Sequence, residues 1–207
     1  MSNLKKNTKS LLEEISEYPN VSLICASKYL SAPMIKEVYE AGVTHFGENH
    51  VQSLQQKLVE LKDLNICWHF IGHLQTNKVK TIINQIDYLH SLDRLSLAKS
   101  IQKYRDTELK CFVEVNLSKE PSKSGIFEEA LTDFLNLLKE YDKIKVVGLM
   151  TMGVLDDLEK TNELFIRLSK LKKEFELDHL SMGMTDDYPL AIKAGSDFIR
   201  IGRKFIL

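Results

Sequence analysis

The sequence lacks the features of disulfide-bonded, secreted and membrane proteins. Its 207 residues contain three cysteines, Cys25, Cys67 and Cys111, each in an apolar run and none in CxxC spacing. An odd number without that spacing predicts buried free thiols in a reducing compartment. The first residues, MSNLKKNTKSLLEEI, have no apolar core like that of a signal peptide, and no run approaches the length of a bilayer span. These absences predict a cytoplasmic protein without a membrane segment.

The sequence also has no excess of charge of one sign and none of the common nucleotide-binding motifs. Its 28 Lys and Arg and 29 Asp and Glu are spread along the chain and give a formal net charge of -1. No basic stretch therefore predicts binding to nucleic acid or an anionic membrane, and a small molecule is the expected partner. No GxGxxG follows the first apolar run, and no GxxxxGK[ST] occurs, which argues against an open dinucleotide-binding sheet.

What the sequence does contain is an end-to-end alternation of short apolar runs and longer amphipathic segments. This alternation is typical of β–α units around a parallel sheet. The apolar residues within most runs are consecutive, which predicts strands buried on both faces. Eight strands are predicted: VSLICAS from Val21, VTHFGEN from Val43, CWHFIG from Cys67, YLHSLD from Tyr88, LKCFVEVN from Leu109, VVGLMTM from Val146, HLSMGM from His179 and FIRIG from Phe198.

Helical patterns fill the intervals between these runs. They cover residues 33–41, 51–62, 77–85, 95–104, 128–141, 158–174 and 188–194, and a further pattern covers residues 4–18. Nothing helical is predicted after the last strand, so the first helix could cover the barrel there. Eight such units fit a closed (β/α)8 barrel or an open doubly wound sheet, and the missing glycine motifs favour the barrel. The fold class is therefore α/β, a TIM-type barrel forming a single domain over residues 1–207.

Ligand sites of barrels lie at the carboxyl ends of the strands, so the polar residues that close each run are the candidates. Lys28 directly follows the first run. At the rim its ammonium would be partly desolvated, and desolvation favours the neutral amine that forms an imine with an aldehyde. The alternative is a lysine that simply extends into solvent at the end of a strand.

The last two strands carry small and hydroxylated residues, in LSMGMTDD and FIRIGRK, where barrels commonly bind phosphate. Ser181 can donate its hydroxyl, and Gly183 and Gly202 can offer backbone N–H groups to an anion. Arg203 adds a positive charge just past the strand. Alternatively, the glycines only relieve crowding in tight turns.

Arg200 interrupts the apolar run FIRIG between Ile199 and Ile201. A buried charge needs a partner, which could be a carboxylate such as Glu114 or an aromatic ring nitrogen of a ligand. An arginine that faces a pyridine nitrogen disfavours protonation there, so a cofactor bound in this way would be a weak electron sink.

Cys67, His69 and His73 superficially resemble a set of metal ligands. Because these residues lie on a strand ending in Gly72 and no fourth ligand is spaced nearby, no metal site is predicted. The loop SKEPSKSG, with Lys119 and Lys123, is predicted to be solvated, although it could contact a phosphate.

The motifs described so far also match a known family. They are CASK around Lys28, HFGEN around Glu48, WHFIGHLQTNK from Trp68, VNLSKEPSKSGI from Val115, VVGLMTM from Val146, LSMGMTDD from Leu180 and IRIG from Ile199. With these seven motifs in this order over nearly its whole length, the chain resembles the pyridoxal phosphate homeostasis protein family. That family is related in fold to the barrel domain of alanine racemase.

The resemblance implies a function and a set of binding residues. Lys28 would form a Schiff base with pyridoxal 5′-phosphate (PLP), Arg200 would contact the pyridine nitrogen, Ser181, Gly202 and the Arg203 backbone would hold the phosphate, and Asn49 and Met182 would lie near the ring. The family is implied to store and deliver PLP to apo-enzymes without established turnover, usually as a monomer. The chain departs from the family at His73, where proline is more common, and at Arg203, where a small hydroxylated residue is common.

Two alternatives to a PLP carrier remain open from the sequence. A PLP-dependent amino-acid racemase would need a second acid or base opposite Lys28, and only Tyr29 and Tyr188 lie near the candidate residues in sequence. An interaction module that uses the cofactor as a signal is the other alternative.

Overall fold

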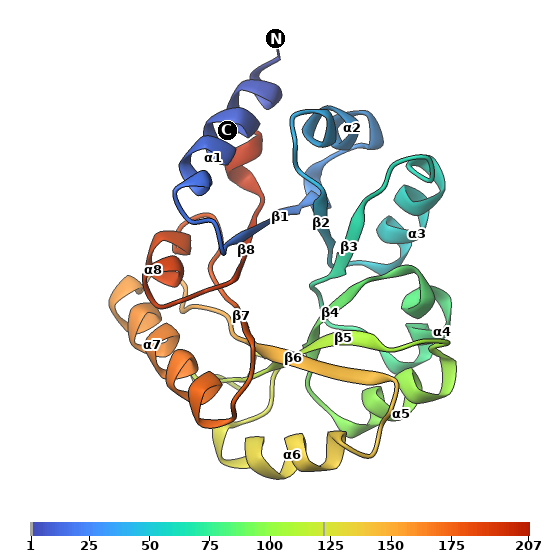
Figure 1. Ribbon diagram of the computed structural model, residues 1–207, viewed down its shortest axis with the longest axis vertical. Helices are drawn as coiled ribbons and strands as arrows, with labels where there is room; N and C mark the ends of the chain where they lie inside the picture. The colour runs from blue at the N-terminus through green and yellow to red at the C-terminus, as the bar shows by residue number, and fades with distance from the viewer. Residues whose placement is uncertain (1, 122) are drawn as a thin grey trace.

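A computed structural model describes residues 2–121 and 123–207 of the chain. Eight parallel strands are hydrogen-bonded in the order β1 to β8 and close on themselves, with the helices outside (Figure 1). This closure confirms the predicted (β/α)8 barrel and rules out the open sheet. The strands are β1 (Ser22–Ala26), β2 (His45–Glu48), β3 (Cys67–Phe70), β4 (Tyr88–Leu92), β5 (Leu109–Glu114), β6 (Ile144–Met150), β7 (His179–Ser181) and β8 (Phe198–Ile201).

Each strand ends before the end of the apolar run that predicted it, so several polar residues assigned to strand ends lie on the following loops. The helices around the barrel are α1 (Asn3–Ser16), α2 (Ala32–Glu40), α3 (Val51–Glu60), α4 (Val79–Ile82), α5 (Leu95–Tyr104), α6 (Leu131–Leu138), α7 (Leu158–Glu174) and α8 (Tyr188–Lys193). Short 3-10 turns add η1 (Ser27–Tyr29), η2 (Thr76–Lys78), η3 (Ile83–Gln85), η4 (Glu128–Ala130) and η5 (Arg203–Phe205).

Two of the helix predictions need correction. The helix predicted over residues 77–85 is broken into a 3-10 turn, one α-helical turn and a second 3-10 turn. Its sequence, NKVKTIINQ, contains four β-branched residues, whose restricted side chains lower the helix propensity. The prediction that nothing helical follows the last strand is also wrong, because the 3-10 turn η5 follows β8 after one intervening residue.

The helix α1 completes the outer ring, as its pattern suggested. It lies between α8 and α2 in Figure 1, where a crossover helix after β8 would otherwise stand. The side-chain amide of Asn7 donates hydrogen bonds to the backbone carbonyls of Phe205 and Leu207, each 3.1 Å away. These bonds attach the first helix to the last residues of the chain.

The core has an outer layer, between strands and helices, and a smaller layer inside the barrel. Successive residues of a strand face opposite sides, so alternate positions supply the two layers. The helix α7 buries the stripe Leu164, Phe165, Leu168 and Leu171 in the outer layer. Ile24, Phe112, Val147, Met150 and Phe198 fill the inside, together with the buried polar residues His69, His90, Ser181 and Arg200.

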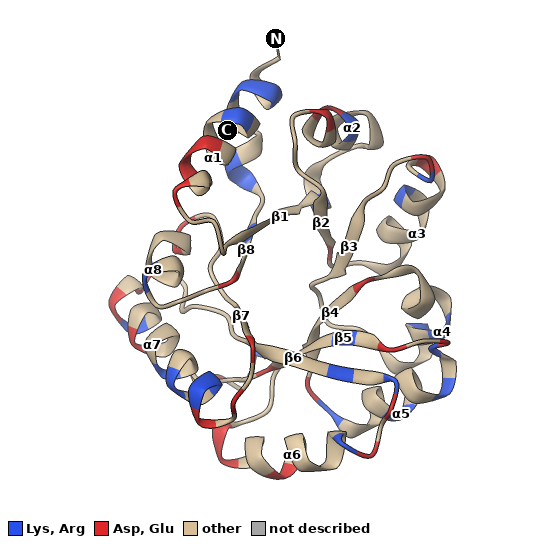
Figure 2. Cartoon of the chain, viewed as in Figure 1, with Lys and Arg blue, Asp and Glu red and all other residues tan. Residues whose placement is uncertain are grey.

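None of the described helices is both long enough and apolar enough to span a membrane. Acidic and basic residues are both spread around the outer helices and connecting loops (Figure 2).

Candidate functional site

Lys28 and Arg200 come from the two strands that close the barrel, because β1 pairs with β8 and Ile24 lies opposite Arg200. Lys28 stands on the turn η1, immediately after β1. Its side chain is exposed, and its ammonium lies 4.9 Å from the centre of the Tyr29 ring. Within residues 2–121 and 123–207 it forms no ion pair. The predicted partial desolvation of Lys28 is therefore not seen, and its amine is accessible from solvent.

A buried ion pair holds the backbone directly before Lys28. The ammonium of Lys57, on α3, pairs with the carboxylate of Glu48, and both side chains are buried. Lys57 also donates to the carbonyl oxygen of Ser27 at 2.7 Å, and the Ser27 hydroxyl donates to Glu48 Oε1 at 2.7 Å. Lys57 was missed from the sequence, although it continues the buried stripe of α3, at Val51 and Leu54, where an apolar residue is expected.

Arg200 is buried inside the barrel without a carboxylate partner among the described residues. Its guanidinium donates to Ser181 Oγ at 2.5 Å, to the carbonyl oxygen of Thr151 at 3.2 Å and to the sulfur of Met152 at 3.3 Å. Burial lowers the pKa of Arg200 to about 10, although the negative charges of Asp187 and Glu114 oppose this shift. The ion pair with Glu114 that the sequence left open is therefore not formed.

Acidic groups stand beside Arg200 at the mouth of the barrel. Burial, assisted by the charge of Asp93, raises the pKa of Glu114 to about 7. Burial likewise raises the pKa of Asp187. Both carboxyls line a cleft of about 590 Å³ that also includes Met152 and Lys123, whereas Lys28 does not line it. The cleft therefore approaches Arg200 from the side of β5 to β7.

The hydroxyl beside Gly202 belongs to Thr185 rather than to Ser181. Ser181 is completely buried, and its oxygen lies 2.7 Å from His90 Nδ1 as well as accepting from Arg200. Thr185 lies on the loop after β7, and its hydroxyl oxygen accepts a hydrogen bond from the Gly202 N–H at 3.4 Å. Ser181 is hydrogen-bonded to Arg200 inside the barrel, whereas the Thr185 hydroxyl lies at the mouth, beside Gly202. The motif LSMGMTDD contained both, but strand parity alone did not separate them.

The two candidate glycines have different reasons to be glycine. Gly183 has φ +94°, and a Cβ there would stand 2.5 Å from the Ala191 Cβ, so backbone conformation and packing already require it. A Cβ on Gly202 would meet nothing closer than the carbonyl oxygen of Ala26, at 3.4 Å. Packing therefore explains Gly183, whereas at Gly202 the absence of a side chain leaves room beside the backbone.

Met182 and Asn49 are placed differently with respect to the mouth. The Met182 side chain is fully buried in the outer layer of the core, because it alternates with the inward-facing Ser181. It could approach a ligand only through its backbone. Asn49 follows β2 and is partly buried, and its Oδ1 atom is buried without a hydrogen-bond partner in the described structure. Asn49 directly follows Glu48 in the sequence, and its Oδ1 atom is therefore free to accept a hydrogen bond from a ligand.

The other charged candidates already have partners. Arg203 pairs with Asp186, and both side chains are largely exposed. Lys123 pairs with Glu120 at 2.7 Å and donates to the carbonyl oxygen of Gly153 at 3.0 Å. Lys119 forms an ion pair with Glu129. Ser122, in the same loop, lies outside the described residues.

The two tyrosines considered for acid–base chemistry are not equivalent. Tyr29 is 57% exposed and lies beside Lys28. Tyr188 is buried, and its hydroxyl donates to the carboxylate of Glu14 and interacts with the ammonium of Lys204. The Tyr188 hydroxyl thus joins α8 to α1 and the C-terminal turn.

The residues that resembled a metal set are not brought together as a group. His73 is half-exposed after β3 and lies 3.8 Å from Asp93. Cys67 and His69 do lie together, at the amino end of the barrel, but the third residue beside them is His45.

Sequence comparisons place this geometry in a known family. Residues 1–204 match the family model of the alanine racemase N-terminal domain. A pyridoxal phosphate homeostasis protein of Aquifex aeolicus is 40% identical over 190 residues, which cover 87% of this chain and 83% of that protein. The protein of the same name from Escherichia coli is 34% identical over 194 residues, covering 88% of this chain and 83% of the relative.

Comparison of structures agrees with this relationship. PipY of Synechococcus elongatus, with PLP bound, superposes with a TM-score of 0.89 and 32% identity over 99% of this chain and all of PipY. Alanine racemase from Corynebacterium glutamicum shares the fold, with a TM-score of 0.78 and 14% identity over 98% of this chain and 59% of the enzyme. From these matches, the chain belongs to the pyridoxal phosphate homeostasis protein family, whose barrel is of the alanine racemase N-terminal type.

Proposed function

We propose that this protein binds PLP reversibly at the carboxyl end of its barrel, with Lys28 as the covalent anchor, and stores and delivers it without turnover. The names of the relatives and the PLP bound to PipY support the choice of ligand. The observation that carries the proposal is the pairing of β1 with β8. An accessible amine follows one strand, and the other carries a buried guanidinium that has no carboxylate partner among the described residues.

The residues at the mouth fit this cofactor chemically. PLP has an aldehyde, a ring nitrogen, a ring hydroxyl and a phosphate, and each requires a different protein group. Lys28 offers the amine, Arg200 a donor toward a ring nitrogen, and the buried amide of Asn49 an unused polar atom. Gly202 leaves space beside a backbone N–H. The site therefore has one group of the right kind for each part of the cofactor.

When bound, PLP supplies an electrophilic aldehyde carbon and an aromatic ring that can accept electrons. The Lys28 amine would form the reversible bond to that carbon, because a neutral amine is the nucleophile required. Lys57 and Glu48 hold the backbone of Ser27 and so fix the starting point of the lysine side chain. Arg200 has donors only, so it would keep a proton off the ring nitrogen and weaken the ring as an electron acceptor.

We assign the phosphate to the loops after β7 and β8. Gly202 and the backbone of Arg203 would donate N–H groups, with Gly183 next to them on the loop after β7. Thr185 would supply the hydroxyl: its oxygen accepts from the Gly202 N–H at 3.4 Å, and a bound phosphate would take over this N–H while the Thr185 hydroxyl donates to it. Ser181 would act through Arg200, to which its oxygen is bonded. The side chain of Met182 would not contact the ring.

A carrier rather than a racemase is supported by the positions of the tyrosines. Racemisation requires a second acid or base on the face opposite the lysine. The hydroxyl of Tyr188 is engaged by Glu14 and Lys204, and Tyr29 lies beside Lys28 itself. We therefore expect no exchange of the α-proton of L-alanine with solvent deuterium by the PLP-loaded protein. Exchange that disappears in Lys28→Ala would instead favour an enzyme, and formation of D-alanine would then identify it as a racemase.

The anchor is tested by absorption spectroscopy and trapping. The purified protein incubated with PLP should show the absorption band of lysine-bound PLP, and borohydride reduction followed by peptide mapping should locate the label on Lys28. Lys28→Ala should lose both signals. Lys139→Ala, an exposed lysine on the C-terminal side of α6, is the matched control and should retain them. A label on another lysine in the wild-type protein would contradict the assignment.

Delivery requires recipients and a defined assembly state. We propose that the carrier is a monomer in the cytoplasm and that PLP-dependent apo-enzymes receive its cofactor. Sedimentation of the PLP-loaded protein should give the mass of one chain. An apo-enzyme should regain activity when mixed with the loaded carrier while a scavenger removes free PLP. Equal restoration by the same total concentration of free PLP, with the scavenger present, would argue against direct transfer.

A further inference from the structure

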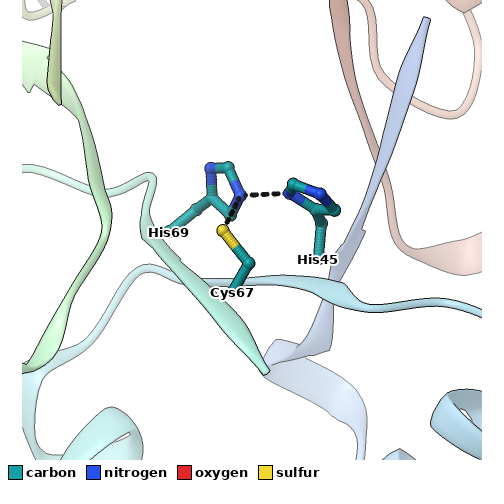
Figure 3. A group of neighbouring side chains, drawn as sticks. All are labelled: His45, Cys67 and His69. Atoms are coloured by element: carbon teal, nitrogen blue, oxygen red, sulfur yellow. Dashed lines mark hydrogen bonds between the residues drawn. The ribbon is translucent and has the colours of Figure 1, made fainter. Parts of the chain in front are cut away.

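A second cluster of donor atoms lies at the amino end of the barrel, opposite the mouth that carries Lys28. His45 and Cys67 are the first residues of β2 and β3 and are paired in the register of these strands. His69 follows Cys67 by two residues on β3, so its side chain faces the same side as that of Cys67. The three side chains point toward one another inside the barrel (Figure 3).

The donor atoms of these side chains converge. His45 Nδ1 lies 2.8 Å from His69 Nε2, and Cys67 Sγ lies 3.5 Å from the same nitrogen. All three atoms lie within 4.8 Å of one another. Ligands of a tetrahedral zinc ion stand about 3.3 Å apart for two nitrogens and about 3.6 Å apart for nitrogen and sulfur. The distance from Cys67 Sγ to His69 Nε2 already matches, and the two imidazoles need to separate by about half an ångström.

We propose that His45, Cys67 and His69 bind a borderline-soft divalent metal ion, with Zn²⁺ as the first choice. Two imidazole nitrogens and one thiolate suit zinc, whereas Mg²⁺ and Ca²⁺ prefer oxygen ligands. Among the described residues, no further histidine, cysteine or carboxylate joins the group. The fourth position is therefore assigned to water, as in zinc sites with three protein ligands.

The chemical state of the three side chains is compatible with binding. Burial lowers the pKa of His45 and that of His69, so both imidazoles are neutral near pH 7. The proton that His45 Nδ1 shares with His69 Nε2 must move to His45 Nε2, which leaves a lone pair on each of the two facing nitrogens without net release of a proton. Burial and the nearby charge of Asp87 raise the pKa of the Cys67 thiol to about 12. Binding must then release the thiol proton: the S–H bond breaks, the metal–sulfur bond forms, and one H⁺ leaves to solvent.

The barrel also holds His69 in position from behind. His69 Nδ1 lies 2.8 Å from His90 Nε2, and His90 Nδ1 lies 2.7 Å from Ser181 Oγ. If His69 donates from Nδ1, its Nε2 keeps a lone pair directed at His45 and Cys67. Such hydrogen bonds from the second nitrogen of a metal-binding histidine fix its ring and tautomer. His69 thus has the support that a metal ligand needs.

The cluster is not closed off from solvent on every side, because His45 and Cys67 are only partly buried. His45 also lines a groove of about 320 Å³, between α1 and the start of β2, that contains Leu12 and Thr44. The ammonium of Lys110 is close enough to affect both histidines and opposes a cation. Its charge is exposed to solvent, which screens this repulsion.

Cobalt(II) is a suitable probe, because it replaces zinc and its thiolate bond gives an intense near-ultraviolet charge-transfer band. The full chain, treated with a chelator, is titrated with Co²⁺ at constant pH. We expect the thiolate band and the visible bands of tetrahedral cobalt to saturate at one ion per chain, with one proton released for the thiol. Added Zn²⁺ should abolish both sets of bands.

Variants separate the site from adventitious binding. Cys67→Ser should lose the charge-transfer band, and His45→Gln should weaken Co²⁺ binding by at least about tenfold, since even outer contacts of metal ligands matter that much. His73→Gln, at the other end of the barrel, should bind as the wild type does. Lys28→Ala should also bind normally, so the result is independent of the proposed PLP site.

The proposal is overturned if the wild-type protein shows no thiolate band or if the band is unchanged in Cys67→Ser. If Cys67→Ser does not fold, His45→Gln decides, because its partly exposed side chain can be replaced without opening the core. In a folded His45→Gln protein, unchanged Co²⁺ affinity would be equally decisive against the site.

Discussion

The two ends of this barrel are built from the same eight strands but present different chemistry. At the carboxyl end, an exposed lysine, a buried arginine and two carboxyls with raised pKa values surround loops and a cleft of about 590 Å³. At the amino end, neutral imidazoles and a thiol contact one another at the starts of β2 and β3. The carboxyl end offers a ligand charged side chains and the backbone of loops, and the amino end offers side chains of neighbouring strands that contact one another.

The difference follows from how each end is made. Loops that follow strands can vary in length and expose backbone N–H groups, so they suit an anionic organic ligand. Strand starts fix side chains by register, since His45 and Cys67 are neighbours across β2 and β3. A site that depends on strand register needs few residues, but the positions of their side chains are fixed by the pairing of the strands. His69, His90 and Ser181 connect the two ends by hydrogen bonds.

The largest expected effect concerns Glu114 at the carboxyl end, measured on the PLP-free protein. Burial raises the pKa of Glu114 from 4.5 to about 7, so the folded protein keeps a proton that the unfolded chain loses between these values. Stability should therefore fall as pH rises through that window, by up to about 3 kcal/mol. Glu114→Gln should remove this fall in urea unfolding curves between pH 4.5 and 8.

The exposed Glu129→Gln should keep the wild-type pH dependence and serves as the control. If stability falls equally steeply with pH in Glu114→Gln, another group is responsible. Glu114 would then no longer be evidence for the electrostatic difference between the two ends of the barrel.

The next effect concerns Arg200. Replacing a charged donor to a ring nitrogen should cost about 1.5–3 kcal/mol, so Arg200→Met should weaken PLP binding by about tenfold to a hundredfold. The absorption band should also shift, because the ring nitrogen could then be protonated. Arg200→Lys retains a charge if Arg200→Met unfolds. Arg167→Met, on the exposed side of α7, should leave binding unchanged; unchanged binding in Arg200→Met would remove this residue from the site.

A smaller effect separates the rim of the mouth from the interior. Thr185→Val should weaken PLP binding about tenfold by removing one hydroxyl from the phosphate. Ser181→Ala should chiefly lower stability, by about 1–3 kcal/mol, because it leaves buried partners at His90 and Arg200 unsatisfied. Titration with PLP and urea unfolding of both variants distinguish the two roles. The reverse pattern would restore Ser181 as the phosphate ligand.

The smallest effect tests the amino end. Removing the positive charge in Lys110→Met should tighten Co²⁺ binding by about twofold to fivefold, since exposed charges interact weakly. The shift should disappear in high salt, which screens the same repulsion. Lys103→Met, on α5, is the control at an exposed position away from the cluster. Weaker binding in Lys110→Met would show that the lysine supports the cluster rather than opposing it.

The sequence predicted the architecture well because the architecture depends on periodicity. All eight apolar runs contain a strand, and the barrel rather than the open sheet was favoured by the missing glycine motifs. The first helix was expected to cover the open position and does so. The helix over residues 77–85 was wrong because β-branched residues interrupt it, an effect that a pattern of apolar spacing does not include.

The sites were predicted less completely, because they depend on direction and register. Lys28 and Arg200 were found, since a charged residue beside or within an apolar run is visible in one dimension. Thr185 was overlooked because β7 ends at Ser181, three residues before the predicted end of the run. His45 was not considered with Cys67, since only the pairing of β2 with β3 makes them neighbours.

Closure of the barrel has a consequence for the synthesis of the chain. β1 is complete at Ala26, but its partner β8 begins only at Phe198. The hydrogen bonds from Asn7 to the carbonyls of Phe205 and Leu207 likewise form only after these residues have been made. At about 5–20 residues per second, a ribosome needs roughly ten to thirty seconds to make the intervening chain. Throughout that time one edge of β1 is unpaired, and an unpaired edge is a template for aggregation. The nascent protein therefore remains an open sheet, with an edge exposed to other chains, until β8 emerges.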